Sequence, residues 1–317
     1  MSPTLFIVIP CYNEETVLPL TAPVFLEELD SLCRQNLISE SSRVLFVNDG
    51  SRDRTWELIC ALAKQDRRVS GISLSRNCGH QNALYAGLMY AKDKCDITIS
   101  IDCDGQDDVH AMDEMVKKYR DDGCEIVYGV RSTRNTDTFL KRSTAVGFYK
   151  LMRHMDAQTV FNHADYRLMS AKALDGLSEF KEVNLYLRGL VPLIGYKSDC
   201  VYYERTRRIA GESHYSFKKM LALAVNGITS LSTVPISLIT TFGSILTAAS
   251  GLALLVELIV FLCGNHVSQA LVIISAMSLL CGFQLLAIGI VGSYVGKIYL
   301  ESKARPRYII AEYTDLE

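Results

Sequence analysis

The chain begins with an alternation of short apolar runs and longer segments that have helical periodicity. The apolar runs occupy residues 5–10, 44–48, 97–101 and 126–130. The segments with apolar positions at helical spacing are residues 16–34, 53–67, 80–92 and 111–122. Strands and helices that alternate in this way predict an α/β domain with a mostly parallel sheet and helices on both faces. In such sheets, ligands bind beyond the carboxyl ends of the strands.

Two long apolar segments follow in the last third of the chain. Residues 236–262 contain one acidic side chain, Glu257, and residues 270–295 contain no charged side chain. Each segment exceeds the roughly 20 residues that a helix needs to cross a bilayer. Because the link between them is short, we expect a two-helix transmembrane hairpin. The alternative is a pair of buried core helices, although core helices are seldom this long and uncharged.

Charged residues around the hairpin predict its orientation. Lys218 and Lys219 precede the first segment, whereas Lys297, Lys303, Arg305 and Arg307 follow the second. The link at residues 263–269 has no Lys or Arg. The positive-inside rule therefore places both ends of the hairpin, and with them the N-terminal domain, in the cytosol. We expect a multi-pass protein of the inner or plasma membrane.

Composition narrows the class of protein further. Apolar residues make up 49% of the chain, and the net charge of −2 gives no sign of nucleic-acid binding. The ten cysteines include no C-x-x-C pair or zinc-ligand spacing. Scattered cysteines of this kind are typical of reduced thiols in a cytosolic domain.

The residues that follow the third apolar run carry the strongest chemical signal. Asp102 and Asp104 are followed by Gln106, so two carboxylates and an amide oxygen share one turn after a strand. Such oxygen ligands suit a hard divalent cation, Mg²⁺ or Mn²⁺, that also binds phosphate oxygens. Taken alone, the same residues are equally compatible with an acidic surface loop.

Polar groups also follow the first two runs. Tyr12 and Glu14 can stack on a base and contact a nucleotide, or they can belong to a helix start with acidic residues at its dipole. Asp49 can accept a hydrogen bond from a base or ribose, but locally an ordinary turn with a helix cap is favoured. Neither group indicates a binding site by itself.

Taken together and in this order, the three groups resemble the motifs of the family 2 glycosyltransferases, which have a GT-A fold. The most similar subgroup transfers sugars to polyprenyl phosphates and includes bactoprenol glucosyltransferases and dolichol-phosphate mannose synthases. The resemblance covers nearly the whole chain, including residues 75–81, 129–131, 141–142, 164–169 and 208–215. Two positions depart from the family pattern: His214 replaces a usual Lys, and Asp108 replaces a frequent Pro.

The resemblance implies a role for each matching residue. The nucleotide pocket would be lined by Pro10, Tyr12, Glu14, Asp49 and Asp102. The divalent metal, Mg²⁺ or Mn²⁺, would be held by Asp104 and Gln106, which makes Asp104 catalytic as well. Asp165 looks like the family's proposed catalytic base. The phosphate and acceptor contacts would come from Arg131, Arg142, Arg208, Ser213 and Tyr215.

The function that this resemblance implies is inverting transfer of one sugar from a nucleotide-sugar to a polyprenyl phosphate such as undecaprenyl phosphate. The product would be a lipid-linked sugar donor for modification of cell-envelope glycans. UDP-glucose is the favoured donor, with UDP-N-acetylglucosamine and GDP-mannose as alternatives. A processive polysaccharide synthase is the first competing function, but the QxxRW motif of those enzymes is absent, since the single Trp is Trp56. A catalytically inactive nucleotide-sugar-binding membrane scaffold is the second.

These predictions divide the chain into four parts. Residues 1–210 form the cytosolic catalytic domain, 211–232 a juxtamembrane amphipathic segment, 233–298 the two membrane helices and 299–317 a basic-then-acidic tail. Small residues form a stripe on the second helix, at Gly289, Gly292 and Gly296. Because small residues let helices approach closely, we also expect a homo-oligomer.

Overall fold

The structure is a computed structural model that describes residues 2–132, 163–182, 185–204 and 269–314. The chain divides into two compact units, Met1–Leu223 with Pro306–Glu317, and Ala224–Arg305. The first unit contains the sheet and the candidate site, and the second contains one described helix.

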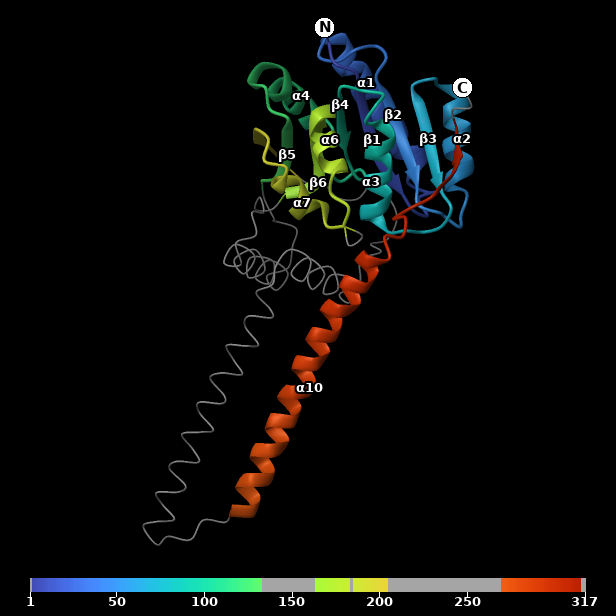
Figure 1. Cartoon of the computed structure of the whole chain (residues 1–317). Coiled ribbons are helices and arrows are strands. Elements are labelled where there is room, and N and C mark those ends of the chain that lie inside the picture. Colours follow the sequence, from blue (N-terminus) through green and yellow to red (C-terminus); the bar gives the residue numbers. More distant parts are fainter. Residues whose placement is uncertain (1, 133–162, 183–184, 205–268, 315–317) are drawn as a thin grey trace. The chain divides into compact units, whose positions relative to one another are not determined.

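The first unit is built on an eight-stranded sheet (Figure 1). In chain order its strands are β1 Leu5–Cys11, β2 Arg43–Asn48, β3 Val69–Leu74, β4 Ile97–Ser100, β5 Ile126–Arg131, β6 His163–Ser170, β7 Ser198–Tyr203 and β8 Ile310–Tyr313. Across the sheet the order is β7-β5-β6-β4-β1-β2-β3-β8. The predicted α/β architecture with a mixed, mostly parallel sheet is confirmed.

Parallel pairing joins the strands that the sequence pattern identified most clearly. Strands β4, β1, β2 and β3 lie side by side and run in the same direction. β1 is buried along its whole length and β2 is buried from Val44 onward, as expected for strands covered on both faces. Because their carboxyl ends meet at one edge, the polar groups after β1, β2 and β4 lie at the same edge of the sheet.

Antiparallel pairing interrupts this pattern at β6. This strand lies between β4 and β5 and runs opposite to both, while β7 pairs in parallel with β5. Strands β3, β6, β7 and β8 were not among the predicted elements. In β6 the reason is visible in the sequence, since buried Asp165 and Arg167 break the apolar pattern of the strand.

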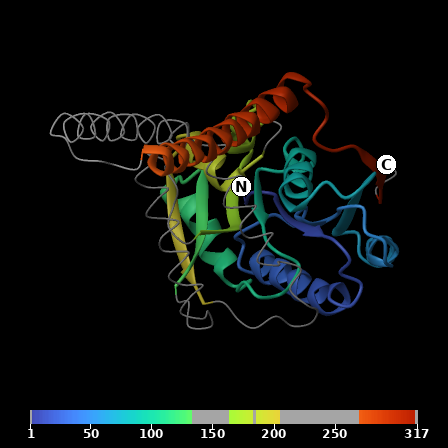
Figure 2. The same ribbon diagram turned by 90° about the horizontal axis from the view of Figure 1, so that it is seen from below.

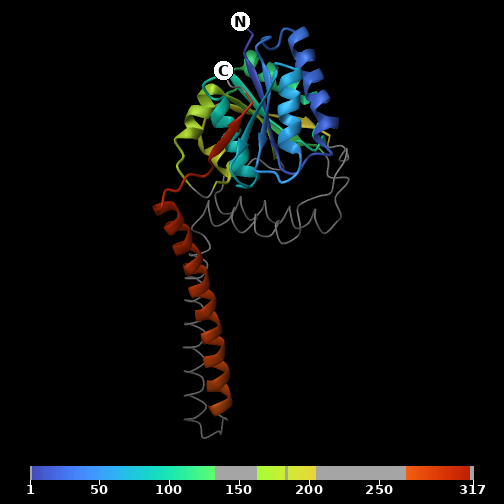
Figure 3. The ribbon, with the colours of Figure 1, turned by 90° about the vertical axis from the view of Figure 1, so that its right-hand side faces the viewer.

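Helices cover both faces of the sheet, as Figure 2 and Figure 3 show for α1 and α3 on opposite sides. One face packs against α1 Leu18–Arg34, α2 Thr55–Gln65 and α4 Ala111–Asp122. The other packs against α3 His80–Ala91, α6 Ala171–Ser178 and α7 Leu187–Leu193. The four helices predicted between the apolar runs are α1, α2, α3 and α4, and all four are present.

The last strand closes one edge of the sheet. β8 pairs antiparallel with β3, and the hydroxyl oxygen of Thr314 accepts a hydrogen bond from Gly71 N at 2.7 Å. The Trp56 indole donates to Glu312 Oε2 at 2.9 Å, which ties α2 to β8. Just before the strand, Arg307 stacks on the ring of Tyr85 in α3. The end of the chain is therefore an integral part of the first unit.

The second unit contains helix α10, Gln269–Ser302, which includes the second predicted membrane segment. The first predicted segment, residues 236–262, lies outside the described residues, as does the predicted amphipathic segment 211–232. Among the described residues, no helix combines the length and the hydropathy that a membrane span requires.

Candidate active site

Hydrogen bonds join the loops that follow β1 and β2. Asn13, with a left-handed φ of 55°, donates its N–H to Ser51 Oγ at 3.0 Å and accepts from Arg52 N at 2.9 Å. The N–H of Glu14 donates to Thr55 Oγ1 at 2.9 Å. These reciprocal contacts hold the predicted nucleotide-binding residues Pro10, Tyr12 and Glu14 against the loop that carries Asp49.

Asp49 connects the loop after β2 to the loop after β3. Its carboxylate is buried and accepts from Cys78 N at 2.7 Å and Gly79 N at 3.0 Å. Burial raises the pKa of Asp49, although these two N–H groups act in the opposite direction. Next to it, Gly50 has φ +60°, and a Cβ there would lie 2.4 Å from the carbonyl carbon of Arg76. Only glycine allows this close approach of the two backbones.

The loop after β4 carries the predicted metal ligands. Asp104 is buried, and its Oδ1 accepts from Gln106 N at 3.1 Å in a tight turn around Gly105, whose φ is 66°. Asp102 is partly buried and lies at the start of this loop. Burial and the nearby carboxylates of Asp107 and Asp104 raise the pKa of Asp102. The loop thus accumulates negative charge, which a divalent cation would neutralise.

No group of three or more His, Cys, Asp or Glu side chains suited to a metal occurs among the described residues. The predicted site is of another kind, because it uses one carboxylate and one amide oxygen, Asp104 and Gln106. Both lie on one short loop and offer only oxygen ligands, so their chemistry fits Mg²⁺ or Mn²⁺.

Asp165, in β6, is surrounded by hydrogen-bond donors. Arg188 in α7 pairs with it through two nitrogens, Nε at 3.2 Å and Nη2 at 3.0 Å. Arg167 Nη2 donates at 2.9 Å from the same strand, and Gln81 Nε2 donates at 3.1 Å from α3. The side chain of Asp165 is only 6% exposed. A buried carboxylate that accepts this many bonds is held as an anion.

The pKa of Asp165 reflects this environment. Burial would raise it, but Arg188, His80 and Arg167 together outweigh burial, so the pKa lies well below its ordinary value. A carboxylate with such a low pKa is a weak proton acceptor near neutral pH. The geometry therefore favours an orienting role for Asp165 over a role as general base.

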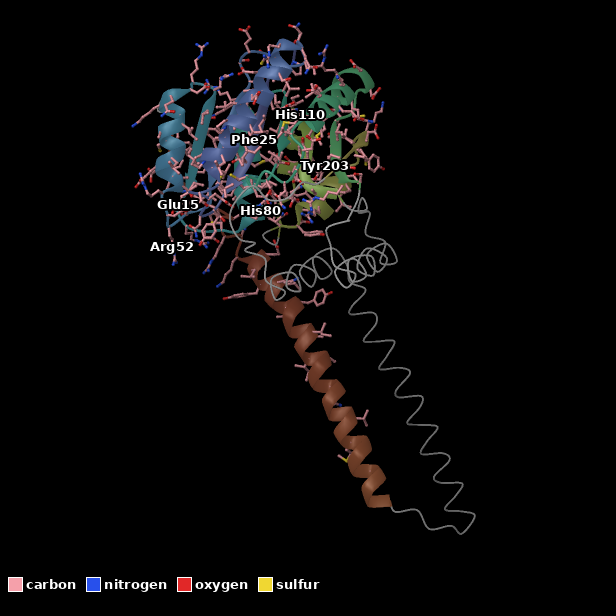
Figure 4. All side chains as sticks on the ribbon, turned by 180° about the vertical axis from the view of Figure 1, so that it is seen from behind. Glu15, Phe25, Arg52, His80, His110 and Tyr203 are labelled. Carbon is pink, nitrogen blue, oxygen red and sulfur yellow. The ribbon has the colours of Figure 1, made fainter. Side chains whose placement is uncertain are left out.

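His80 lies between Asp102, which is predicted to bind the nucleotide, and Asp165, which is predicted to act on the acceptor. Its Nε2 lies 3.6 Å from Asp102 Oδ1 and 3.6 Å from Asp165 Oδ2. Burial lowers the pKa of His80, but Asp165 and Asp102 have the larger combined effect and raise it. In Figure 4, His80 and Glu15 mark the edge of the sheet where β3 and β1 end. The carboxylates assigned to nucleotide and acceptor thus lie on either side of one imidazole.

Arg131, predicted to bind phosphate, lies at the end of β5 and pairs with Asp107. Its Nη2 is 3.2 Å from Asp107 Oδ1, and its Nε donates to the hydroxyl oxygen of Tyr203 at 3.3 Å. Its phosphate-binding role stays a prediction. The other predicted phosphate and acceptor residues lie outside the described part of the chain: Arg142, Arg208, Ser213 and Tyr215.

Sequence reasoning gave no role to several side chains that form the centre of the site. Gln81 accepts from Leu187 N at 3.0 Å and donates to Asp165, so it joins α3, β6 and α7. Arg188 belongs to the short helix α7, for which no element was predicted. Residues 75–81 were part of the motif resemblance, which was the available signal for His80 and Gln81. Nothing in the local pattern marked Arg188.

The sequence matches the family described as Glycosyl transferase family 2 over residues 6–177. A curated relative, the uncharacterized glycosyltransferase YkoT of Bacillus subtilis (strain 168), is 47% identical over 97% of this chain and 91% of its own length. The bactoprenol glucosyl transferase of Shigella phage SfX is 37% identical over 96% of this chain and 97% of its own length. The chain belongs to glycosyl transferase family 2, and it is a glycosyltransferase related to bactoprenol glucosyl transferases.

A solved structure with similar coverage is the mannosyltransferase PcManGT from Pyrobaculum calidifontis in complex with GDP-Man and Mn²⁺. It covers 95% of this chain and 85% of its own chain, with 17% identity and a TM-score of 0.45.

Proposed function

We propose that the protein transfers a single glucose from UDP-glucose to a polyprenyl phosphate such as undecaprenyl phosphate, with inversion at the anomeric carbon. The observation that carries this proposal is the 37% identity to a phage bactoprenol glucosyl transferase, which extends over 96% of this chain. An alignment of that extent includes the C-terminal apolar segments as well as the sheet domain. The product would be a lipid-linked glucose for modification of cell-envelope glycans.

The donor is proposed to bind at the edge where β1, β2 and β4 end. Pro10, Tyr12 and Glu14 come from the loop after β1, Asp49 from the loop after β2 and Asp102 from the loop after β4. The hydrogen bonds that join the loops after β1, β2 and β3 would preorganise the pocket for a nucleotide. Preorganised contacts of this kind lower the conformational cost of binding.

Asp104 and Gln106 are proposed to hold the divalent cation. When bound, a cation there would neutralise charge on the donor diphosphate, which favours its departure. The protein's own contribution is the tight turn at Gly105, which keeps both oxygen ligands on one short loop.

Asp165 is proposed to orient the acceptor side of the site and not to remove a proton. A phosphate monoester is already largely anionic at neutral pH, so its oxygen can attack without a general base. Arg188 and Arg167 keep the Asp165 carboxylate ionised, and the partly exposed Arg188 would add positive charge beside the reacting phosphates. Arg131, Arg142 and Arg208, with Ser213 and Tyr215, remain the proposed phosphate and acceptor contacts.

The membrane location is part of the same proposal. A polyprenyl chain leaves a bilayer at a cost of about 0.8 kcal/mol per exposed CH₂, so its phosphate must be met at the membrane surface. Helix α10 carries exposed apolar side chains along its length, among them Ile273, Met277, Ile288 and Val295. These exposed apolar side chains support a membrane location. The inner or plasma membrane, the cytosolic side of the sheet domain, the helical hairpin and homo-oligomeric packing are proposed from the sequence pattern.

The direct test uses purified full-length protein with radiolabelled UDP-glucose, undecaprenyl phosphate and Mg²⁺ or Mn²⁺. We expect one labelled glucose on each lipid, and no transfer by Asp104→Ala. Parallel reactions with UDP-N-acetylglucosamine and GDP-mannose identify the sugar. A product that grows beyond one sugar would instead indicate a processive synthase, and absence of transfer from all three donors would overturn the proposal.

A further inference from the structure

The loop with the predicted metal ligands is anchored by Asp107, the residue that follows Gln106. This carboxylate is 5% exposed, and its Oδ1 accepts a hydrogen bond from the Tyr203 hydroxyl at 2.7 Å. The same oxygen is 3.2 Å from Arg131 Nη2. Tyr203 is the last residue of β7 and Arg131 the last of β5, so two neighbouring strand ends hold one buried carboxylate.

A second tyrosine holds the following residue. The hydroxyl group of Tyr166, in β6, donates to the backbone carbonyl oxygen of Asp108 at 2.9 Å. The rings of Tyr166 and Tyr203 pack edge to face, with centroids 5.2 Å apart. Three adjacent strands thus contribute side chains that fix residues 107 and 108, directly after the ligand Gln106. Figure 4 labels Tyr203 in this part of the sheet domain.

These contacts show that the Asp107 carboxylate is bound by protein side chains. Its charge is matched by Arg131, and burial together with Asp107 raises the pKa of Tyr203 well above its ordinary value, so the phenol remains a donor. A buried carboxylate with two such partners is poorly placed to become a cation ligand. The loop is anchored there, and Asp104 and Gln106 keep their positions relative to that anchor.

We propose that Tyr203 is a positioning residue that sets the affinity of the Asp104–Gln106 loop for its divalent cation by holding Asp107. The inference rests on the proposed cation site. Without the phenol hydroxyl, Asp107 keeps Arg131 but loses its shortest hydrogen bond, and the loop must be ordered when the cation binds. Ordering on binding lowers affinity because its cost is subtracted from the binding free energy.

The test measures binding of Mn²⁺ to full-length protein by electron paramagnetic resonance, which counts free Mn²⁺, in the presence of UDP. Tyr203→Phe retains the packed ring and removes the hydroxyl. We expect its Kd for Mn²⁺ to rise about tenfold, the change that an ordering cost of about 1.4 kcal/mol on binding produces. Its Kd for UDP measured without metal should equal that of the unaltered protein, a result that a general loss of structure would not give.

Tyr202→Phe is the matched control, because Tyr202 precedes Tyr203 on β7 and is 68% exposed. It should bind Mn²⁺ as the unaltered protein does. Tyr166→Phe removes the bonds of its hydroxyl group to the backbone carbonyl oxygens of Asp108 and Val109, so it should also weaken Mn²⁺ binding. It decides the matter if Tyr203→Phe does not fold. Unchanged Mn²⁺ affinity in Tyr203→Phe would overturn the inference. If that variant does not fold, unchanged affinity in Tyr166→Phe would overturn it. Neither result would contradict the proposed glucosyl transfer. Unaltered protein that binds no Mn²⁺ would overturn the cation site and this inference together, whereas absence of transfer with normal Mn²⁺ binding would refute only the proposed function.

Discussion

Replacement of Asp165 by asparagine separates the electrostatic role of this residue from its shape. The amide has nearly the same volume as the carboxylate, but it carries no charge and presents an NH₂ group to a set of donors. Arg167 is only 1% exposed and would lose the carboxylate that lies 2.9 Å from its Nη2. Arg188 would lose a partner that accepts from two of its nitrogens.

The size of the effect follows from burial. Removal of one partner from a buried ion pair costs about 3–5 kcal/mol of unfolding free energy, because the other charge stays buried without compensation. Arg188 is partly exposed and recovers some hydration, so we expect a value near the lower end, about 3 kcal/mol. For a domain of about 200 residues this corresponds to a Tm lower by roughly 6–12 °C.

The pH dependence of the same variant gives an independent check. The pKa of Asp165 is depressed in the folded state, so its contribution to stability is present above the unfolded value of about 3.9. That contribution is lost as the pH falls through the folded pKa. The difference in Tm between the unaltered protein and Asp165→Asn should therefore shrink in strongly acidic solution, where Asp165 becomes protonated. It should also decrease as the pH rises through the pKa of His80, because Asp165 stabilises the charged imidazole and raises that pKa.

Calorimetry of the purified full-length protein measures the difference, with Asp175→Asn as control. Asp175 pairs with Lys92 at 2.7 Å on the surface, so its loss should change the free energy by less than about 1 kcal/mol. Assays should show a kcat for Asp165→Asn reduced by at least about tenfold, the effect of about 1.4 kcal/mol on the barrier, with UDP affinity nearly unchanged. A Tm equal to that of the control would refute the buried ion-pair argument, and collapse of UDP binding would move Asp165 to the donor side.

Three further predictions concern the loops and the sheet edge. Asp104→Ala should abolish metal-dependent transfer without lowering Tm by more than a few degrees, and full activity of this variant in EDTA would contradict the metal assignment. Gly50→Ala should lower the unfolding free energy in urea by more than about 2 kcal/mol, because its Cβ would meet backbone atoms 2.4 Å away in addition to the cost of φ +60°. Gly123→Ala, with φ +65° and open space around the new Cβ, should lose only about 1 kcal/mol, and equal losses at the two positions would show that the close approach is unimportant. Trp56→Phe should lower Tm modestly by removing the indole bond to Glu312, and increased proteolysis of the C-terminal residues would report detachment of β8; unchanged protection would contradict that role.

The sequence pattern predicted the parallel part of the fold because apolar periodicity and burial coincide there. β1 and β2 are continuous apolar runs, and α4 ends at Gly123, which adopts the left-handed conformation common after helices. β3 escaped detection because Gly71 and two serines interrupt its apolar residues. Gly71 is needed there, since a Cβ would lie 2.4 Å from Ile59 Cγ2 in α2. β8 is only four residues long and mostly exposed, so its pattern carries little information about burial.

The site was predictable where a motif follows a strand and unpredictable where side chains meet through space. Asp102, Asp104 and Asp49 could be singled out because each follows an apolar run. The surroundings of Asp165 could not, because Gln81 lies 84 residues earlier in the chain and Arg188 lies 23 residues later. Strand β6, which brings these residues together, runs antiparallel to its neighbours and has a polar sequence. Pairing of that kind depends on tertiary context, which local periodicity does not contain.

The final strand has a practical consequence for work on the isolated sheet domain of this enzyme. A chain cut after Tyr203 would leave β3 with an open edge, whose exposed N–H and C=O groups can pair with another molecule and promote aggregation. It would also remove the contact between Arg307 and Tyr85 in α3. Residues 306–314, joined to the N-terminal domain through a flexible Gly/Ser linker in place of the intervening chain, would restore both contacts. The fragment suited to crystallisation or nucleotide-binding studies of the sheet domain is therefore discontinuous in sequence, with its last piece taken from beyond the apolar segments.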